Sequence, residues 1–353
     1  MTDRRREFED LRRQMAEIDT DIVRALQRRA QVARQIGSLG PSAPASSAAD
    51  REQLALLEKA AEGDLPPEIV RSVLREVRSA TAWLERPGRV VYAGPEGGFA
   101  QVAAQRQFGQ AATLAPVEST ELAIDEVARR RADFAVIPFE SSIEGPLQSS
   151  IEAISMTDLS LAAKVEIDTV PSLMAKVAGE DRPLKIYASA TDRAVCRKYL
   201  AARPEATIVE VASPLAACQM AAQDASAAAV APESVGLELG LVTLAHNLAD
   251  RADVRVRYGV VSVRPSQRST SDTTALLFGV GDAPGALFDV LKHFAERGIN
   301  VKTIHSSPKH GENWIYLFYV EVAGHVTDRG IVTALEEIKR ETRVLKVLGS
   351  FPS

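Results

Sequence analysis

Cysteine is scarce in this chain: only Cys196 and Cys218 occur among 353 residues, and they form no CxxC pair. This scarcity excludes a disulfide framework and indicates buried thiols in a reducing compartment. No apolar run is long enough to span a bilayer, and the charged start MTDRRREFED lacks the apolar core of a secretory signal. We therefore expect a cytoplasmic protein.

Two further absences narrow the class of ligand. Neither GxGxxG nor GxxxxGK[ST] occurs, so a nucleotide cofactor has no support in the sequence. The net charge of −5 and the pI of 5.7 give no general attraction to nucleic acid or to an anionic membrane. A small-molecule ligand is favoured, and neither a cofactor nor a metal is expected.

The first part of the chain has the pattern of a helical domain. Apolar side chains recur at three- and four-residue steps over 5–37, which predicts one long amphipathic helix. The stretch GSLGPSAPASSAAD, rich in Gly, Pro and Ser, predicts a mobile loop at 38–49, and shorter helices are predicted at 50–62 and 67–85. Since the long helix cannot bury its whole apolar stripe against two shorter ones, we expect an intertwined helical dimer.

The rest of the chain has two further patterns. Over 88–267, the β-branched runs RVVYAG, FAVIPF, LKIYAS, AAVAP and VRYGVV alternate with alanine-rich helical stretches such as 100–108 and 119–131. This alternation predicts α/β units around largely parallel sheets, with ligand-binding loops at the carboxyl ends of the strands. A compact βαββαβ run over 272–353 predicts a ferredoxin-like fold.

The order of these segments resembles the bifunctional chorismate mutase–prephenate dehydratase family. LRRQMAEIDTDIVRALQRRAQVARQIG is similar to its mutase helix, and YAGPEGGFAQ, VIPFESSIEGPL and HNLADRAD to its dehydratase landmarks. PGALFDVLKHFAERGINVKTIHSSP is similar to its ACT regulatory domain. The resemblance implies three parts: an all-α chorismate-mutase-like domain at 1–87, a two-lobed, periplasmic-binding-protein-like α/β dehydratase domain at 88–267, and a ferredoxin-like ACT domain at 272–353. It also implies a homodimer that acts on chorismate and prephenate in phenylalanine biosynthesis.

The mutase reaction is a pericyclic rearrangement, so its site needs no nucleophile. It must hold a compact dianion and stabilise negative charge growing on the ether oxygen, and guanidinium groups bind carboxylates bidentately. The resemblance implies that the site comprises Arg12 (from the partner subunit), Arg29, Arg51, Glu52 and Glu85, the last as a protonated donor to the ether oxygen. The alternative is that the arginines form only the solvated face of a helix.

One residue departs from the family's mutase pattern. Gly40 stands where the family has a lysine that also faces the ether oxygen. Loss of one of two donors to a developing charge predicts about 3 kcal/mol less transition-state stabilisation.

The dehydratase reaction expels a ring hydroxyl together with carbon dioxide, and this hydroxyl needs a proton donor. The family places a Thr-Arg-Phe triplet on a strand, and its threonine assists departure of the hydroxyl. DVRVRYGVV is predicted to be that strand, with Val254, Val256 and Tyr258 on one face and Arg255 and Arg257 on the other. Val256 therefore replaces the threonine, and valine neither donates nor accepts a proton.

The other residues of the dehydratase cleft follow from the same resemblance: Glu140, Ser141, Ser142, Glu144 and Ser189. For Glu140 and Glu144 the alternative is a capping or loop role. A second register, with Thr273 or Thr274 as the threonine, is rejected because these residues lead into the first ACT strand, where threonine is a good strand former.

Two segments near the C-terminal end resemble the family's site for an amino-acid effector. The first is Gly285, Ala286, Leu287 and Phe288, where glycine allows close backbone approach and the helix start favours a carboxylate. The second is His305, Ser306, Ser307 and Pro308, which lacks the family's acid and arginine. This difference weakens the case for phenylalanine as the effector.

Three functions stay open from the sequence. The chain is a mutase–dehydratase of phenylalanine biosynthesis, a diverged paralogue that decarboxylates prephenate without aromatising it, or a non-catalytic sensor of aromatic metabolites. The products formed from chorismate and prephenate distinguish the three.

Overall fold

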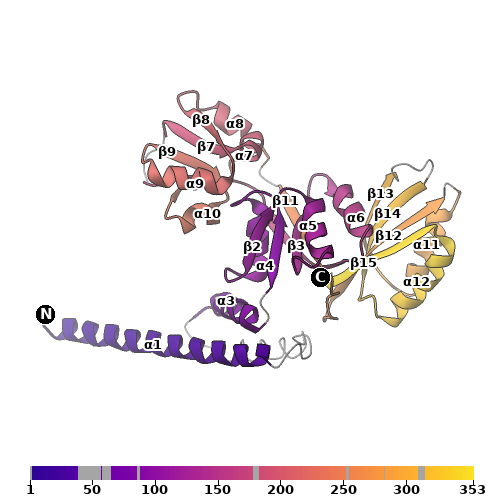
Figure 1. The fold of residues 1–353 in the computed structure, drawn as a ribbon, viewed down its shortest axis with the longest axis horizontal. Helices are drawn as coiled ribbons and strands as arrows, with labels where there is room; N and C mark the ends of the chain where they lie inside the picture. The colour runs from indigo at the N-terminus through magenta and orange to yellow at the C-terminus, as the bar shows by residue number, and fades with distance from the viewer. Residues whose placement is uncertain are drawn as a thin grey trace. The chain divides into compact units, whose positions relative to one another are not determined.

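The computed structural model describes residues 2–38, 57, 65–85, 88–177, 183–251, 254–281, 283–308 and 315–353. The chain divides into two compact units (Figure 1). One comprises Met1–Gly88 with Phe108–Ala112, and the other comprises Arg89–Gln107 with Thr113–Ser353. None of the helices in the described ranges is both long and apolar enough to cross a membrane.

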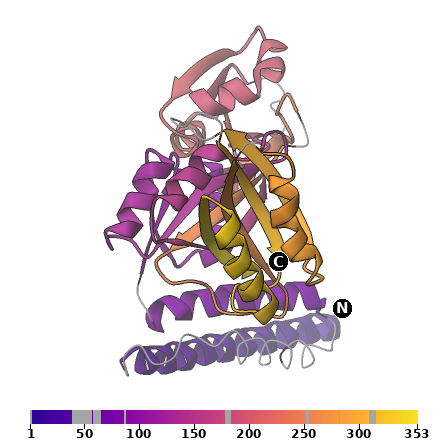
Figure 2. The same ribbon diagram turned by 90° about the vertical axis from the view of Figure 1, so that its right-hand side faces the viewer.

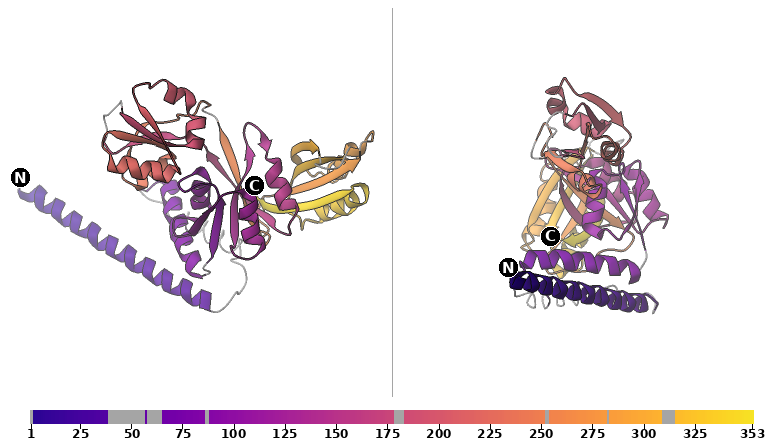
Figure 3. Two further views of the ribbon diagram at one scale, coloured as in Figure 1. Left: turned by 45° about the horizontal axis from the view of Figure 1, so that its top comes forward. Right: turned by 90° about the vertical axis from the view of Figure 1, so that its left-hand side faces the viewer.

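The first unit is helical. α1 (Thr2–Ser38) is one unbroken helix (Figure 3), and it packs against α3 (Pro67–Glu85). The predictions of helices at 5–37 and 67–85 are confirmed. The helix predicted at 50–62 and the loop predicted at 38–49 fall almost wholly outside the described residues. One apolar face of α1 is exposed, and its members with more than half of their surface exposed include Phe8, Leu11, Met15, Ile18 and Ile22.

The second unit begins with an α/β lobe. Its sheet has the order β2-β1-β3-β11-β5, with short β4 beside β3. The bounds of its strands are β1 Arg89–Ala93, β2 Thr113–Val117, β3 Phe134–Ser141, β4 Gly145–Pro146, β5 Ser160–Asp168 and β11 Arg255–Ser262. Its helices are α4 Phe99–Phe108, α5 Thr120–Ala128 and α6 Gln148–Ser155.

A second α/β lobe has its own sheet, in the order β10-β6-β9-β7-β8. β9 is a run of alanine and valine buried along its whole length, as a strand covered on both faces requires. The strands are β6 Ser172–Ala175, β7 Lys185–Ser189, β8 Thr207–Val211, β9 Ala227–Ala231 and β10 Val242–Ala245. The helices are α7 Ala190–Val195, α8 Arg197–Ala201, α9 Pro214–Gln223 and α10 Glu233–Glu238, and both cysteines are free and buried in this lobe.

The two-lobed α/β prediction is confirmed, but the prediction of largely parallel sheets is wrong. β1 pairs with β2 and β3 in parallel, whereas β11 is antiparallel to both β3 and β5. The second sheet is mixed as well. The physical reason in the first lobe is the chain path: β11 returns from the second lobe and starts where β3 ends, so it runs against β3.

The last part of the second unit has the predicted βαββαβ order. Its strands form an antiparallel sheet in the order β13-β14-β12-β15, and Figure 2 shows α11 and α12 side by side on one face of it. The bounds are β12 Asp272–Gly281, α11 Ala286–Ala295, β13 Val301–Pro308, β14 Ile315–Ala323, α12 Arg329–Glu341 and β15 Val344–Pro352. The ferredoxin-like prediction is confirmed, and Thr273 and Thr274 are buried in its first strand.

This C-terminal domain and the first lobe share one hydrophobic core. Phe139 and Leu161 of the first lobe pack in a cluster with Tyr319, Leu348 and Phe351 of the C-terminal sheet. The backbones approach closely at Gly349, where a Cβ atom would overlap the carbonyl oxygen of Leu161. The contact between the two domains therefore requires glycine at this position.

Candidate functional site

One edge of the first-lobe sheet gathers the loops that the sequence singled out. β1 and β3 are parallel, so the segments that follow them leave the sheet at the same edge. β11 is antiparallel to β3 and starts at this edge, which places Val256 opposite Ser141 on β3 and Ile167 on β5. We call this region the β3 edge and define it as residues 94–98, 141–145 and 255–256.

The two faces of the sheet differ sharply at the β3 edge. Residues directly opposite each other on neighbouring strands share a face, so Ser141 and Val256 lie together and are both half-buried. Arg257 and its partners Glu140 and Glu166 lie on the opposite face. Along β11, Arg255 and Arg257 are exposed, whereas Tyr258 is buried, as the alternation in DVRVRYGVV predicts.

The glycine turn at 94–98 contributes backbone to the β3 edge. The side-chain oxygen of Gln101 accepts hydrogen bonds from the Tyr92 hydroxyl at 3.0 Å and from the Gly97 amide at 2.7 Å. Gly97 has φ +74°, and a Cβ atom there would lie 2.5 Å from the Leu215 nitrogen of the second lobe. The same nitrogen donates to the Glu96 carbonyl at 3.2 Å, so this turn joins the two lobes.

The ESSIEG loop is tied to the start of β11 by its backbone and hydroxyls. The Ser142 amide donates to the Arg255 carbonyl at 2.9 Å, and the Ser142 hydroxyl accepts from the Arg255 amide at 3.0 Å. The Ser141 hydroxyl accepts from the Ile143 amide at 3.2 Å, and Glu144 is exposed. Ser141, Ser142 and Val256 therefore lie together at the β3 edge.

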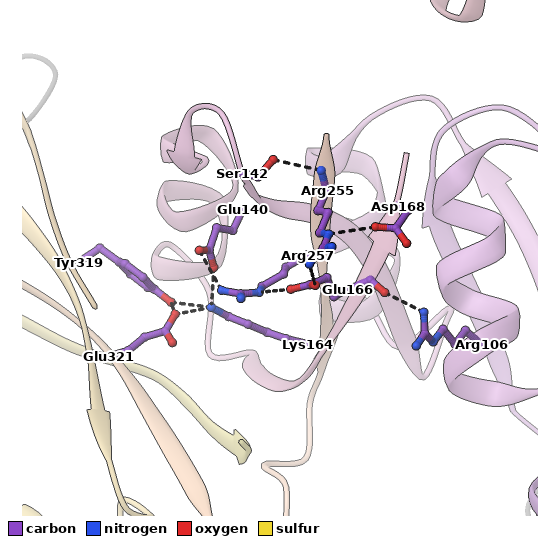
Figure 4. Close-up of polar contacts among 10 residues, drawn as sticks. All are labelled: Arg106, Glu140, Ser142, Lys164, Glu166, Asp168, Arg255, Arg257, Tyr319 and Glu321. Carbon is purple, nitrogen blue, oxygen red and sulfur yellow. Dashed lines mark hydrogen bonds and ion pairs between the residues drawn. The ribbon is translucent and has the colours of Figure 1, made fainter. Parts of the chain in front are cut away.

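Glu140 lies on the face of the sheet opposite Val256. It belongs to a cluster of charged side chains (Figure 4). One carboxylate oxygen accepts from Arg257 at 3.1 Å, and the other is 3.3 Å from the Lys164 ammonium. Both oxygens have cationic partners on the face opposite Ser141. Sequence reasoning missed Lys164, because a lysine in the strand SLAAKVEID is usually solvated, and only its contacts with distant residues reveal its burial.

Ser189 belongs to the second lobe, where it caps α7. Its hydroxyl accepts from the Asp192 amide at 3.2 Å and donates to the Asp192 carboxylate at 2.6 Å. Burial raises the pKa of Asp192 to about 6, although the hydrogen bond from Ser189 acts in the opposite direction. Asp192 was not among the residues predicted from the sequence, and only 4% of its surface is exposed.

Only part of the predicted mutase site lies in the described residues. Arg12 and Arg29 are both on α1, 17 positions apart, which at 1.5 Å per residue is about 25 Å. Arg29 donates to the Val77 carbonyl of α3 at 3.1 Å. Gly40, Arg51 and Glu52 lie outside the described residues, as does the side chain of Glu85, with which α3 ends.

The two predicted effector segments lie on different elements. Gly285, with φ +85°, caps the start of α11, and Phe288 on the first turn is 67% exposed. Ala286 and Leu287 are half-buried on the same turn, whereas His305, Ser306, Ser307 and Pro308 end the edge strand β13. His305 also approaches the β3 edge, since its Nδ1 lies 3.9 Å from the position of a Cβ atom on Gly145.

Family models match three consecutive parts of the chain: chorismate mutase type II at 11–86, prephenate dehydratase at 90–266 and an ACT domain at 274–340. The chain is 34% identical to a bifunctional chorismate mutase/prephenate dehydratase of Aquifex aeolicus, over 98% of each chain. It is 31% identical to the protein of the same name from Neisseria gonorrhoeae, over 95% of this chain and 94% of that one. A crystal structure of prephenate dehydratase from Arthrobacter aurescens in complex with L-Phe has a TM-score of 0.61 and 28% identity, and the match covers 75% of this chain and 90% of that one.

The raised pKa of Asp192 predicts a pH dependence of stability. The ordinary value of 3.8 rises to about 6 in the folded protein, so the native state binds this proton more tightly than the unfolded chain. The free energy of unfolding therefore falls by roughly 3 kcal/mol as pH rises through this interval, and it stays reduced above it. Asp192→Asn is expected to remove this fall, which thermal unfolding at about pH 4.5 and about pH 7.5 measures.

Asp224→Asn is the control of opposite sign, because hydrogen bonds from Ser226 and then Lys185 lower the pKa of Asp224. This substitution is expected to reduce stability at the higher pH. An Asp192→Asn protein whose melting temperature changes with pH as that of the wild type does would contradict a buried, hard-to-ionise carboxyl.

Proposed function

Because the chain belongs to the bifunctional chorismate mutase–prephenate dehydratase family, we propose that it isomerises chorismate to prephenate and then converts prephenate to phenylpyruvate. The observation that carries this function is the succession of mutase, dehydratase and ACT domains along nearly the whole chain. It acts in phenylalanine biosynthesis, in the cytoplasm. The domains extend over 1–87, 88–267 and 272–353.

The mutase site forms between two copies of the chain. Arg12 and Arg29 lie too far apart on one straight helix to bind the same small dianion, so a site with both takes Arg12 from the partner subunit. The exposed apolar face of α1 supports a second copy as the partner that covers it, because an amphipathic helix in a protein gains most of its stability from packing its apolar face. Arg51, Glu52 and Glu85 complete the site, and Gly40 lowers its rate.

The dehydratase site is the β3 edge, and Ser141 supplies the hydroxyl that Val256 lacks. Cross-strand partners place their Cβ atoms about 5 Å apart, so either residue can contact the same atom of a bound ring. The Ser141 hydroxyl accepts one hydrogen bond from Ile143, which leaves its proton for the departing ring hydroxyl. The backbone amides of the glycine turn line the same edge, as do the residues Ser142 and Glu144. Ser189 contributes from the second lobe, through its hydrogen bond with Asp192.

The ACT domain binds an amino-acid effector. The segments Gly285–Phe288 and His305–Pro308 form its site, and the L-Phe complex of the Arthrobacter aurescens enzyme makes phenylalanine the first amino acid to test. Phenylalanine binding here does not use the acid and arginine of the family pattern, since Ser306 and Ser307 occupy that region.

Complementation tests the shared mutase site. Arg12→Ala and Arg29→Ala chains are each expected to lose nearly all mutase activity. Co-expressed, they are expected to recover about a quarter of the wild-type rate, because half of a random mixture is mixed dimer and each mixed dimer has one intact site. No recovery in the mixed dimer would show that both arginines serve a site within one chain.

Product analysis tests the dehydratase site. Wild-type protein is expected to form phenylpyruvate from prephenate, identified by mass. Ser141→Ala is expected to lower kcat by about 100-fold, the usual contribution of a positioned proton donor, and Val256→Thr to raise it several-fold. Ser149→Ala, at an exposed serine on α6, is the matched control and is expected to have no effect.

The other products decide between the remaining functions. A hydroxylated decarboxylation product would favour the diverged paralogue, since a valine beside the ring hydroxyl leaves that group in place. Prephenate binding without turnover would favour a sensor. Equal rates for Ser141→Ala and the wild type would remove Ser141 from the chemistry.

A further inference from the structure

Lys164 is a buried cation shared by two domains. Its side chain on β5 is 9% exposed, and its ammonium pairs with Glu140 of the first lobe and with Glu321 on β14 of the ACT domain. The ammonium is also 3.3 Å from the Tyr319 hydroxyl. Three aromatic rings surround it, with centroids 4.9 Å away for Phe139, 5.7 Å for Tyr319 and 5.3 Å for Phe351.

The Lys164 ammonium pairs with both carboxylates in the junction, and Arg257 is a second cationic partner of Glu140. The Glu140 and Glu321 side chains are 17% and 10% exposed. Removing one partner of a buried pair leaves an uncompensated charge, which is more costly than the pair itself is favourable. The same burial, with the charge of Glu321, raises the pKa of Tyr319 well above its ordinary value, so this hydroxyl stays protonated and donates to Glu321.

A β-bulge in β3 explains how Lys164 reaches two consecutive residues of one strand. Arg257 pairs with Glu140 and Tyr258 with Pro138, so Phe139 is the extra residue. A bulge puts neighbouring residues on one face and re-aims the side chain that follows. Phe139 and Glu140 therefore both contact Lys164, and Ser141 turns to the other face beside Val256.

The charged cluster continues from Glu140 into β11. Glu140 accepts a hydrogen bond from Arg257, and Arg257 also donates to Glu166 at 2.9 Å. Arg255 pairs with Asp168 at 3.0 Å and with Glu166 at 3.5 Å (Figure 4). Val256 lies between these two arginines, so its backbone is held on both sides by ion pairs on the face away from the substrate.

We propose that Lys164 is a positioning residue for the dehydratase reaction. By pairing with Glu140 and Glu321 together, it fixes the bulge of β3 and the start of β11 against the ACT domain, and thereby sets the positions of Ser141 and Val256. It does not touch the substrate. This inference rests on the proposed dehydratase function of the β3 edge.

Lys164→Met tests this role, because methionine keeps much of the side-chain volume and removes the charge. The variant is expected to lower kcat for prephenate by about tenfold with little change in KM, since a misplaced donor slows chemistry more than binding. Calorimetric titration with phenylpyruvate is expected to give about one site per chain, as in the wild type, which excludes a loss of folded protein as the cause. The chorismate mutase rate of the same chains is an internal reference.

Lys346→Met is the matched control. Lys346 on β15 also pairs with a first-lobe carboxylate, Asp158, at 3.4 Å, but Asp158 is fully exposed. This variant is expected to keep the wild-type kcat and KM. If Lys164→Met does not fold, Glu321→Gln removes the charge and keeps the shape, and it is expected to lower kcat by about threefold.

Amide hydrogen exchange tests the positioning role of Lys164 independently of turnover. Exchange over 255–261 is expected to be faster in Lys164→Met than in the wild type and unchanged in Lys346→Met. If the wild type forms no phenylpyruvate, the dehydratase proposal fails and the exchange result still reports on Lys164. Wild-type kcat and wild-type exchange in a folded Lys164→Met protein would overturn the positioning role.

Discussion

The antiparallel pairing of β11 with β3 is the constraint on which the rest of the structure depends. This pairing inserts β11, which follows the second lobe in the chain, between β3 and β5 of the first-lobe sheet. The chain therefore leaves the first lobe after β5 and returns to its sheet at β11. It also sorts side chains by face. Ser141 and Val256 lie on one side, and Arg257 with Glu140 lies on the other. A shift of one residue would exchange the two sets, because the side-chain period of a strand is two.

The buried carboxyl groups of the second unit are accommodated in different ways. Glu140 and Glu321 share the Lys164 ammonium where the first lobe meets the ACT domain. Asp192 has a hydroxyl partner but no cation among its described contacts, and burial raises its pKa instead. The first arrangement joins two domains, whereas the second stabilises one short helix start. Of these two arrangements, the one with a cationic partner is therefore the one at the contact between two domains.

Much of the local structure could be predicted from the sequence, because it depends on local periodicity. The helix at 67–85, the strand predicted in DVRVRYGVV and the βαββαβ order of the ACT domain each follow from patterns within a few residues. The direction of β11 could not be predicted, since it depends on the path through the second lobe. The cluster around Lys164 could not be predicted either, because its members come from four strands and from two domains. Ser141 and Val256 of the candidate site were named from the sequence. Which β3 side chains share a face with Lys164 could not be, because it depends on the bulge at Phe139.

The register of β3 and β11 is most directly measured by cross-linking. Cα atoms of directly opposed residues lie about 5 Å apart, within the range of a disulfide, so Ser141→Cys with Val256→Cys is predicted to cross-link on mild oxidation. The native cysteines are buried and do not compete. The cross-linked protein is predicted to lose dehydratase activity and keep mutase activity. A cross-link that forms instead between Glu140→Cys and Val256→Cys, or one at 141 and 256 that leaves dehydration intact, would contradict the account.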